Sequence, residues 1–523
     1  MPAPAAAPPP SGLSIAHLQN NTAKWWWADP GLRKLTIGIA CGFAVTVNNG
    51  YDMSLMGGLM ANPQFMRDID HPDANKLGLI VAAISLGMIP SLMFAPAVAD
   101  RFGRRIAIAI GYVIVIAAVL VQTFAIGGWK MFAGRFVLGF GSSIVFVGSS
   151  PYVAEIAHPR NRAETAALIN CNFYVGSIIS AWVTFGTLNI KSNWSWRLCT
   201  LLQLGPPVFV LSLLPFAPDS PRWLVGKDRV DDAHRMLAKY HANGEMNDEL
   251  VLFELEEIKE AIAAEKAYRA GSQYSAFFKT KGNRHRLFII VMVGFLSQWV
   301  GNGIISYYLV DILKSVGITA PSQQTGYNGG LQIFNLFAAV FGSLMVERVG
   351  RRKMWLTSAC GMLASYIVIT ACSAAYTEKG NKGAGYAVMA FLFVYFGFYD
   401  IAFTGLSVAY PLEVLTFSLR TKGIAITMLS MSCALFFNMY VNPIALQHLA
   451  WKYYFVYIGI IIFAIVVIYF FFPETKGRLL EEVAEIFDGP QAHVSGDRHD
   501  DRQDDFLDPD RKGSADEVED SKV

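Results

Sequence analysis

Residues 100–105 read DRFGRR, and residues 347–352 repeat the pattern as ERVGRR, 247 positions further on. A Glu that is followed seven residues later by Arg also occurs twice, at Glu155 and, 258 positions on, at Glu413. Motifs that recur in the same order at a nearly constant offset indicate an internal duplication. The sequence therefore predicts two halves that share one fold.

The composition is typical of a membrane protein. Hydrophobic residues make up 53% of the 523 residues and charged residues 16%, whereas about a quarter of the residues in a soluble domain are charged. Nearly half of the charged side chains lie in residues 217–286 and 491–523, so the rest of the chain has too few polar groups to cover a water-soluble particle. The formal net charge is +2 and no long run of Lys and Arg occurs, which argues against nucleic acid as a partner.

Twelve windows of mostly apolar residues are long enough to cross a bilayer as helices, which takes about 20 residues. Six of them precede the charged segment 217–286 and six follow it. The expected fold class is therefore all-α and integral to the membrane, with twelve transmembrane helices in two pseudo-symmetric six-helix bundles. The windows are 35–53, 77–99, 106–126, 131–153, 165–187, 198–216, 287–309, 326–346, 354–375, 384–410, 424–442 and 453–472.

Basic residues indicate which connections face the cytoplasm. The short connections after the second, fourth, eighth and tenth windows are rich in Arg and Lys, and the others hold few. Both termini are therefore expected to be cytoplasmic, and residues 253–269 have the charge pattern of a solvent-exposed helix. The expected domains are a cytoplasmic N-terminal segment (1–34), a first bundle (35–216), a cytoplasmic helical loop (217–286), a second bundle (287–472) and a cytoplasmic tail (473–523) that is disordered from about 489.

Sequence signals for metal, nucleotide or redox chemistry are absent. The six cysteines are widely spaced in apolar stretches and match no metal-binding or disulfide pattern. Neither a phosphate-binding GxxxxGK[ST] loop nor an HExxH motif occurs. We therefore expect no metal, no cofactor and no enzymatic activity.

Further motifs carry a resemblance to a known family. Together with the two halves and their (D/E)RxGRR loops, they make the chain resemble the sugar porter family of the major facilitator superfamily over about residues 24–488. The resemblance is greatest to the fungal hexose and lactose-permease-like branch. It implies the major facilitator fold and a multi-pass transporter of the plasma membrane. The motifs are Gly50-Tyr51-Asp52, Gly134-Arg135, PDSPRWL (218–224), PETKG (473–477), Trp25-Trp26-Trp27, QWVGNG (298–303), Tyr307-Tyr308 and NPIAL (442–446).

Asp52 and Arg135 are the candidates for proton coupling. At 1.5 Å per residue, both lie close to the expected outer face of the membrane, on the first and fourth windows, so the two side chains can meet. An ionisable residue in a membrane span is costly and faces a partner or a cavity. The resemblance implies proton symport, since many members that only facilitate diffusion have Asn in place of Asp52. The alternative is a carboxylate at a helix terminus in the headgroup region.

The repeated loops are the candidates for a cytoplasmic gate. The positive-inside rule explains their Arg residues, but not the glycines at matching places, Gly103 and Gly350, which permit a tight turn. The resemblance implies that these loops and the Glu–Arg pairs form charge networks that hold one conformation and break in the other. The expected gate comprises Asp100, Arg101, Arg104, Arg105, Glu155, Arg162, Glu347, Arg348, Arg351, Arg352, Glu413 and Arg420.

Polar and aromatic residues inside the apolar windows are the candidates for substrate binding, because sugar hydroxyls need hydrogen-bond partners in a dry site. A single polar side chain in a span is more often a helix-packing contact, so we expect about half of the candidates to touch substrate. They are Asn170, Asn172, Gln298, Asn302, Tyr307, Tyr308, Asn335, Phe403 and Asn438.

Departures from the family pattern leave the solute open. Asn170 stands where many sugar porters have Gln, Gly303 takes the usual place of an Asn, and Asp400 is an additional acid with no family counterpart. The expected substrate is a hexose or disaccharide, and the expected partners are the sugar, protons and the lipid bilayer. The alternatives are a transporter of a polyol, a quinate-like acid or a secondary metabolite, and a sugar sensor built on a transporter body.

Overall fold

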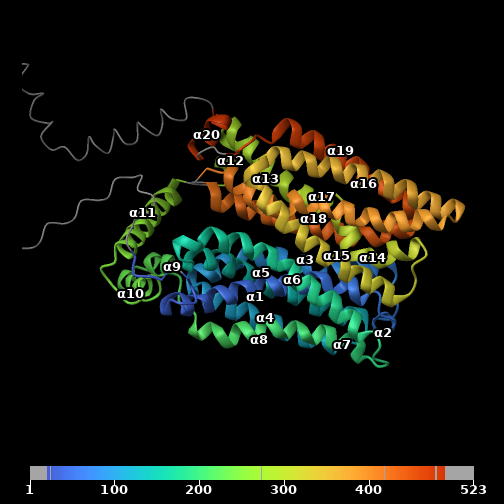
Figure 1. Ribbon diagram of the computed structural model, residues 1–523, viewed down its shortest axis with the longest axis horizontal. Helices are drawn as coiled ribbons and strands as arrows, with labels where there is room; N and C mark the ends of the chain where they lie inside the picture. The colour runs from blue at the N-terminus through green and yellow to red at the C-terminus, as the bar shows by residue number, and fades with distance from the viewer. Residues whose placement is uncertain (1–19, 24, 272–273, 417–418, 477–479, 489–523) are drawn as a thin grey trace, which may run out of the picture.

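The computed structural model describes residues 20–23, 25–271, 274–416, 419–476 and 480–488. These residues form helices and no β-strand. Most of the helices run along the long axis of the molecule, and the two halves of the chain lie side by side (Figure 1). The expected tail from about 489 onward lies outside the described residues.

The first half contains six spans, as the apolar windows predict. Pro30 and Asp29 explain where the first one begins, because Pro fits the first turn and the Asp29 carboxylate accepts a hydrogen bond from the backbone N–H of Leu32. The spans are α1 (Pro30–Leu59), α3 (Ala74–Phe102), α4 (Arg104–Thr123), α5 (Gly128–Ile156), α6 (Arg162–Thr187) and a sixth built in succession from α7 (Trp194–Leu201), η3 (Leu202–Leu204), α8 (Gly205–Leu213) and η4 (Leu214–Phe216), with short helices α2 (Pro63–Asp68) and η2 (Pro159–Asn161) between spans.

The second half repeats this arrangement with one difference. The window 287–309 predicts a single span, but α13 ends at Trp299 and α14 begins at Asn302. Gly301 between them has φ +107°, which a residue with a side chain rarely adopts. The helices are α13 (Lys281–Trp299), α14 (Asn302–Ser315), α15 (Pro321–Val349), α16 (Arg351–Lys379), α17 (Lys382–Val414), α18 (Arg420–Leu449), η6 (Ala450–Tyr453) and α19 (Tyr454–Phe471).

Nine segments of the described residues are long and apolar enough to cross a membrane, and one of them, Lys422–Phe471, contains both α18 and α19. Helices α1 and α6 are long as well, but polar residues such as Asn48, Asp52 and Asn172 lower their hydropathy. Together these segments correspond to the twelve spans that the sequence predicts.

The charged central segment forms helices at one end of the molecule. The expected helix 253–269 lies within α11 (Glu249–Gly271), which follows α9 (Pro221–Gly226) and α10 (Val230–His241). The short α12 (Ala276–Lys279) and α20 (Leu480–Asp488) lie at the same end (Figure 1). We call this end the α10 end; by the charge of its loops it is the end expected to face the cytoplasm.

Contacts between the two halves run from the opposite end to the middle of the spans. At the opposite end, the Tyr440 hydroxyl of α18 donates a hydrogen bond to Asn75 of α3 at 3.3 Å. Nearer the middle, the hydroxyl of Ser85 lies 3.8 Å from the sulfur of Met439. The two bundles therefore touch each other over this part of the spans.

Candidate functional site

Asp52 lies on α1, fully buried, with 0% of its surface exposed. One carboxylate oxygen accepts a hydrogen bond from the Asn48 side chain at 2.8 Å, and the other accepts one from the Gln203 side chain at 3.0 Å. Asn48 precedes Asp52 by one helical turn, and Gln203 lies on η3, in the broken sixth span. The carboxyl group is therefore held by two neutral amides, neither of which the sequence analysis named.

Arg135 of α5 lies near Asp52 and is also buried, at 1% exposure. Its charge interacts with Asp52 and with the tyrosines Tyr307 and Tyr308 of α14, in the other half. Within the described residues, however, no hydrogen bond or ion pair joins Arg135 to Asp52, and the Arg135 Nε has no partner. The structure thus brings the two predicted residues together without closing the ion pair.

A small cavity lies beside Asp52, between α1, α4 and α5. Asn48, Tyr112 and Ser142 line it together with apolar side chains such as Val45. The Asn48 Oδ1, the Tyr112 hydroxyl and the Ser142 hydroxyl are buried and have no hydrogen-bond partner in the protein. Three buried polar groups without a partner in the protein therefore lie beside the Asp52 site.

Three of the predicted substrate residues are engaged in packing within the second half. The Tyr308 hydroxyl donates to the Met439 carbonyl at 2.6 Å, and the Asn438 side chain donates to the Gln298 carbonyl. Phe403 is 1% exposed, between Trp355 at 4.4 Å and Tyr399 at 5.5 Å between ring centroids. These contacts fit the helix-packing alternative.

Other predicted substrate residues keep polar groups available near the break between α13 and α14. Asn302 donates to the Tyr399 hydroxyl at 2.9 Å, while its own side-chain oxygen has no partner. Gln298 and Tyr307 are half-buried. Because Tyr307 also interacts with Arg135, this region adjoins the Asp52 site.

The remaining candidates lie on α6 and α15. Asn172 is half-buried on α6. Asn335 of α15 is 1% exposed, and its side-chain oxygen has no partner. The side chain of Asn170 lies outside the described part of the chain. Asp400 of α17 is buried and accepts a hydrogen bond from Tyr174 of α6, so these helices supply polar groups from both halves.

Three of the predicted gate residues of the first half, Asp100, Arg104 and Glu155, form a network at the α10 end. Arg104 contacts Asp100 at 3.0 Å and Glu155 at 3.5 Å, and Arg105 contacts Asp219 at 3.3 Å. Glu155 also accepts a hydrogen bond from Ser220, at the start of α9. The side chain of Arg101 is exposed to solvent, and its guanidinium lies over the Phe102 ring. The network thus ties α3, α4 and α5 to the central helices.

The second half has a corresponding network. Arg351 donates two hydrogen bonds to one Glu413 oxygen, at 3.0 Å and 2.9 Å. Glu474 accepts from the backbone N–H groups of Arg351 and Arg352 at 2.8 Å and 3.1 Å, where a carboxylate is favoured by the helix N-terminus. Arg348 is exposed, and the side chain of Glu347 lies outside the described residues.

The predicted pairing of Glu155 with Arg162 is not the one observed. Glu155 pairs with Arg104, and Arg162 pairs instead with Glu254 of α11 at 3.4 Å. His241 binds the other Glu254 oxygen at 2.6 Å. Likewise, the observed partner of Glu413 is Arg351. The sequence could not reveal that the central helices supply a competing acid.

His158 lies next to this cluster, outside the spans, with its ring 5.1 Å from the His241 ring. Burial, and then the neighbouring His241, lowers the pKa of His158 from 6.5 to about 3. The imidazole is therefore neutral at physiological pH, and its Nδ1 accepts a hydrogen bond from the Arg160 backbone N–H.

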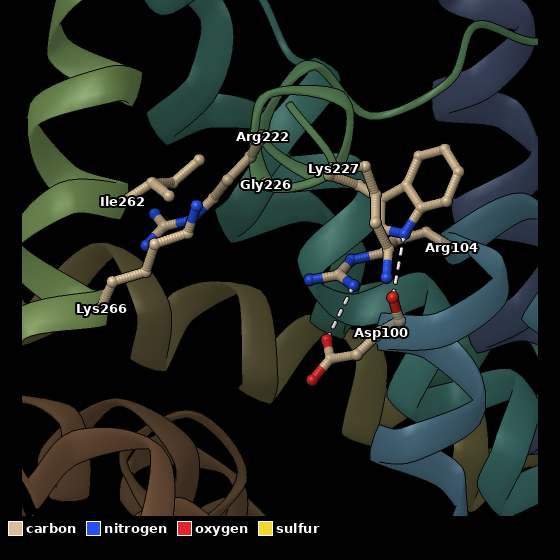
Figure 2. Close-up of a pocket in the computed structure, with 8 residues that line it drawn as sticks. Asp100, Arg104, Arg222, Gly226, Lys227, Ile262 and Lys266 are labelled. Atoms are coloured by element: carbon tan, nitrogen blue, oxygen red, sulfur yellow. Dashed lines mark hydrogen bonds and ion pairs between the residues drawn. The ribbon is translucent and has the colours of Figure 1, made fainter. Parts of the chain in front are cut away.

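A pocket at the α10 end adjoins the first network. Basic side chains from α4, α9 and α11 line it beside Asp100 (Figure 2). Lys266 contacts Asp228 at 3.6 Å, and the Trp223 indole donates to the Asp100 carbonyl at 3.1 Å. The pocket thus belongs to the surface where the central helices rest on the first bundle.

The family model described as "Sugar (and other) transporter" matches residues 39–487. The MFS-type transporter criB of Aspergillus cristatus is 28% identical over 462 residues, which is 87% of this chain and 95% of that protein. Sugar transporter STL1 of Saccharomyces cerevisiae is 27% identical over 490 residues, 90% of this chain and 83% of that protein.

Among solved structures, the xylose transporter XylE of E. coli in a partially occluded inward-open conformation has a TM-score of 0.71 at 18% identity, over 86% of this chain and 100% of that one. This match confirms the expected major facilitator fold. Since the family model covers most of the chain, the protein is a membrane protein that belongs to the sugar porter family of the major facilitator superfamily.

Proposed function

We propose that the protein is a secondary active transporter that carries a sugar, a hexose or a disaccharide, across the plasma membrane together with a proton. The observation that supports this most is the buried Asp52, which two amides hold in place near the charge of Arg135. Under this proposal both termini face the cytoplasm and the protein has no enzymatic activity.

The proposed mechanism is alternating access between two pseudo-symmetric bundles, with the substrate between them. Protonation of Asp52 removes its attraction for Arg135 and frees the guanidinium to interact with Tyr307 and Tyr308 across the half interface. The substrate then binds among the polar groups near Asn302 and Gln298. Because coupling is reciprocal, the proton and the sugar each tighten the binding of the other.

The charge networks at the α10 end serve as the gate in this proposal. Among the described residues, each network joins residues of its own half to the central helices or to the segment after α19, through residues such as Ser220 and Glu474. Rearranging these contacts changes the relative energy of the two orientations without touching the substrate.

A second candidate is a transporter of another solute, such as a polyol, a quinate-like acid or a secondary metabolite. Two observations favour keeping it: the similarity to MFS-type transporters of Aspergillus whose names mention no sugar, and the acid Asp400 among the polar residues of the spans. A sugar sensor is a third alternative.

The test is uptake of radiolabelled glucose, lactose, cellobiose and xylose in yeast that lacks its own sugar transporters, at acidic external pH, with and without an uncoupler. We expect one of these sugars to accumulate and the uncoupler to abolish the accumulation. If none enters cells that carry the protein at the surface, the sugar proposal fails, and polyols and organic acids are assayed next.

A further inference from the structure

A second carboxylic acid, Asp400 of α17, lies where the two halves meet. Its Oδ1 accepts hydrogen bonds from the hydroxyl of Tyr174, on α6 of the first half, and from Thr404 of its own helix at 2.8 Å. The hydroxyl oxygens of Tyr174 and Thr404 lie 3.2 Å apart. One oxygen of Asp400 therefore joins a helix of the first half to a helix of the second.

This contact lies far from either membrane surface. Asp400 falls near the middle of α17, a helix of 33 residues, and Tyr174 falls at the middle of α6, a helix of 26 residues. Asp400 is 1% exposed and Tyr174 is 6% exposed. An ionised carboxylate at this depth needs a cation or several donors to offset its loss of water.

The structure supplies no cation there. The titratable groups that interact electrostatically with Asp400 are the phenols of Tyr174, Tyr395 and Tyr399. Among the described residues, no lysine, arginine or histidine of the neighbouring helices pairs with it. The second oxygen, Oδ2, is buried and has no hydrogen-bond partner.

The ionised and the neutral forms of Asp400 differ in how well they fit this geometry. If the group were ionised, two neutral donors would serve Oδ1, but Oδ2 would remain charged without water or a partner, a cost that two hydrogen bonds do not offset. If the group is neutral, the proton lies on Oδ2, and Oδ1 still accepts both hydrogen bonds. The neutral acid leaves one O–H without a partner, whereas the anion leaves a charge without one, so the neutral form fits the site better.

We propose that Asp400 is a second proton-binding site, whose neutral form joins the two halves through Tyr174. When the halves separate along this contact, water reaches the carboxyl group, and the acid dissociates into a carboxylate and a proton that enters the aqueous cavity. Proton binding therefore favours the joined arrangement. This proposal rests on the proposed function only for the rocking of the two halves. The protonation of Asp400 does not depend on which solute is carried.

Infrared difference spectroscopy of the purified full-length protein at pH 7, without any sugar, tests the protonation directly. We expect the wild type to show a carbonyl stretching band of a neutral carboxylic acid that Asp400→Asn loses and Asp52→Asn retains. If the wild type and Asp400→Asn do not differ in this region, or differ only in a carboxylate band, the proposal is overturned. Since no substrate is added, a failure of sugar uptake leaves this result unaffected.

Two further variants test the link between the halves and keep Asp400 in place. Tyr174→Phe removes the donor from the first half, and Thr404→Val removes the donor from the same helix. We expect each to move the band to higher frequency, because the carbonyl oxygen loses one hydrogen bond. A band that stays unmoved in Tyr174→Phe would show that Asp400 does not join the halves.

Discussion

The two halves match at the α10 end and differ in the membrane interior. Arg104–Glu155 in the first half corresponds to Arg351–Glu413 in the second, and the glycines of both loops have nearly equal φ angles of +95° and +99°. In the interior, the repeat offsets of 247 and 258 positions place Asp52 of the first half opposite residues 299–310 of the second, a stretch that contains no acid.

The duplicated loops and the membrane interior are therefore under different structural constraints. The loops at the α10 end form duplicated charge networks, which depend on the same turn and the same ion pair in each half. The interior carries one acid in the first half, held within that half, and another, Asp400, that contacts across the halves. The duplication therefore preserves the framework of the gate, whereas the chemistry of the interior is asymmetric.

The largest expected effect comes from removing the acid of the first half. Asp52→Asn keeps the shape of the side chain, but it cannot lose a proton at any working pH. Its one amide oxygen can accept from only one of Asn48 and Gln203, so the other must turn its own amide oxygen toward the new NH2 group. We expect concentrative uptake to be abolished while exchange of labelled for unlabelled substrate continues. Continued accumulation by this variant would remove Asp52 from the coupling. Asn62→Asp, between α1 and α2 and outside the spans, is the control and should leave accumulation intact.

The second-largest expected effect comes from breaking the ion pairs Arg351–Glu413 and Arg104–Glu155. Arg351 binds Glu413 with two hydrogen bonds at 2.9–3.0 Å, whereas Arg104 approaches Glu155 to only 3.5 Å. We expect Glu413→Gln to shift the conformational equilibrium by about 2 kcal/mol, or roughly thirtyfold, because hydrogen bonds to charged groups are the strong ones.

The matched variant for this comparison is Glu155→Gln, for which we expect a shift of about 1 kcal/mol, or roughly fivefold. The measurement is the rate at which a cysteine introduced by Asn302→Cys is alkylated in each background. A larger change for Glu155→Gln than for Glu413→Gln would show that the first network, not the second, dominates the gate.

Lowering the pH should destabilise the first half selectively. The native pKa of His158 is about 3 and the unfolded value is 6.5, so the unfolded chain binds more protons between these two pH values. Stability is therefore complete above about pH 6.5 and falls as the pH decreases, by about 2 kcal/mol at pH 5.

Thermal unfolding at pH 7 and pH 5 measures this effect. His158→Asn keeps a side-chain acceptor for the Arg160 N–H and has no proton to gain, so it should reduce the difference between the two pH values. An unchanged pH dependence in this variant would mean that other groups cause the loss.

The last effect comes from the matching turns. An Ala at Gly103 or Gly350 would have to adopt a positive φ with an extended ψ, a conformation nearly confined to glycine, at a cost of about 1–3 kcal/mol. Its Cβ would lie 3.2 Å from the Trp223 ring in the first half and 2.8 Å from the Glu474 carboxylate in the second. We expect Gly350→Ala to lower the melting temperature more than Gly103→Ala does, because it displaces the carboxylate that caps α16.

Gly186 of α6 provides the control for these turns. A Cβ there would meet nothing within 4 Å, and its φ is not positive. Gly186→Ala should therefore leave the melting temperature unchanged or raise it slightly. Equal losses for Gly103→Ala and this control would contradict the account of the turn.

The sequence predicts the framework well because its determinants are local. Apolar windows, loop charges and the repeated loops are each read from a short stretch, and they identify the spans and the duplication. The break at Gly301 was not expected, because a lone glycine in an apolar window does not reveal its φ.

The site is predicted only in part, because partners depend on how helices rotate and pack. Asp52 and Arg135 lie near each other as expected, but the residues that hold Asp52 are Asn48 and Gln203. Gln203 is a polar residue within an apolar window, which is the same signal that identified the candidate substrate residues. Asn48 could have been found from its place one turn before Asp52.

Proton movement is the most direct test of the central claim, that Asp52 couples a proton to the solute. The measurement is the external pH of a weakly buffered suspension of cells that express the protein, recorded while the transported sugar is added. The wild type should make the medium more alkaline as sugar enters, and Asp52→Asn should produce no change. Uptake of sugar by the wild type without any change in pH would contradict the account.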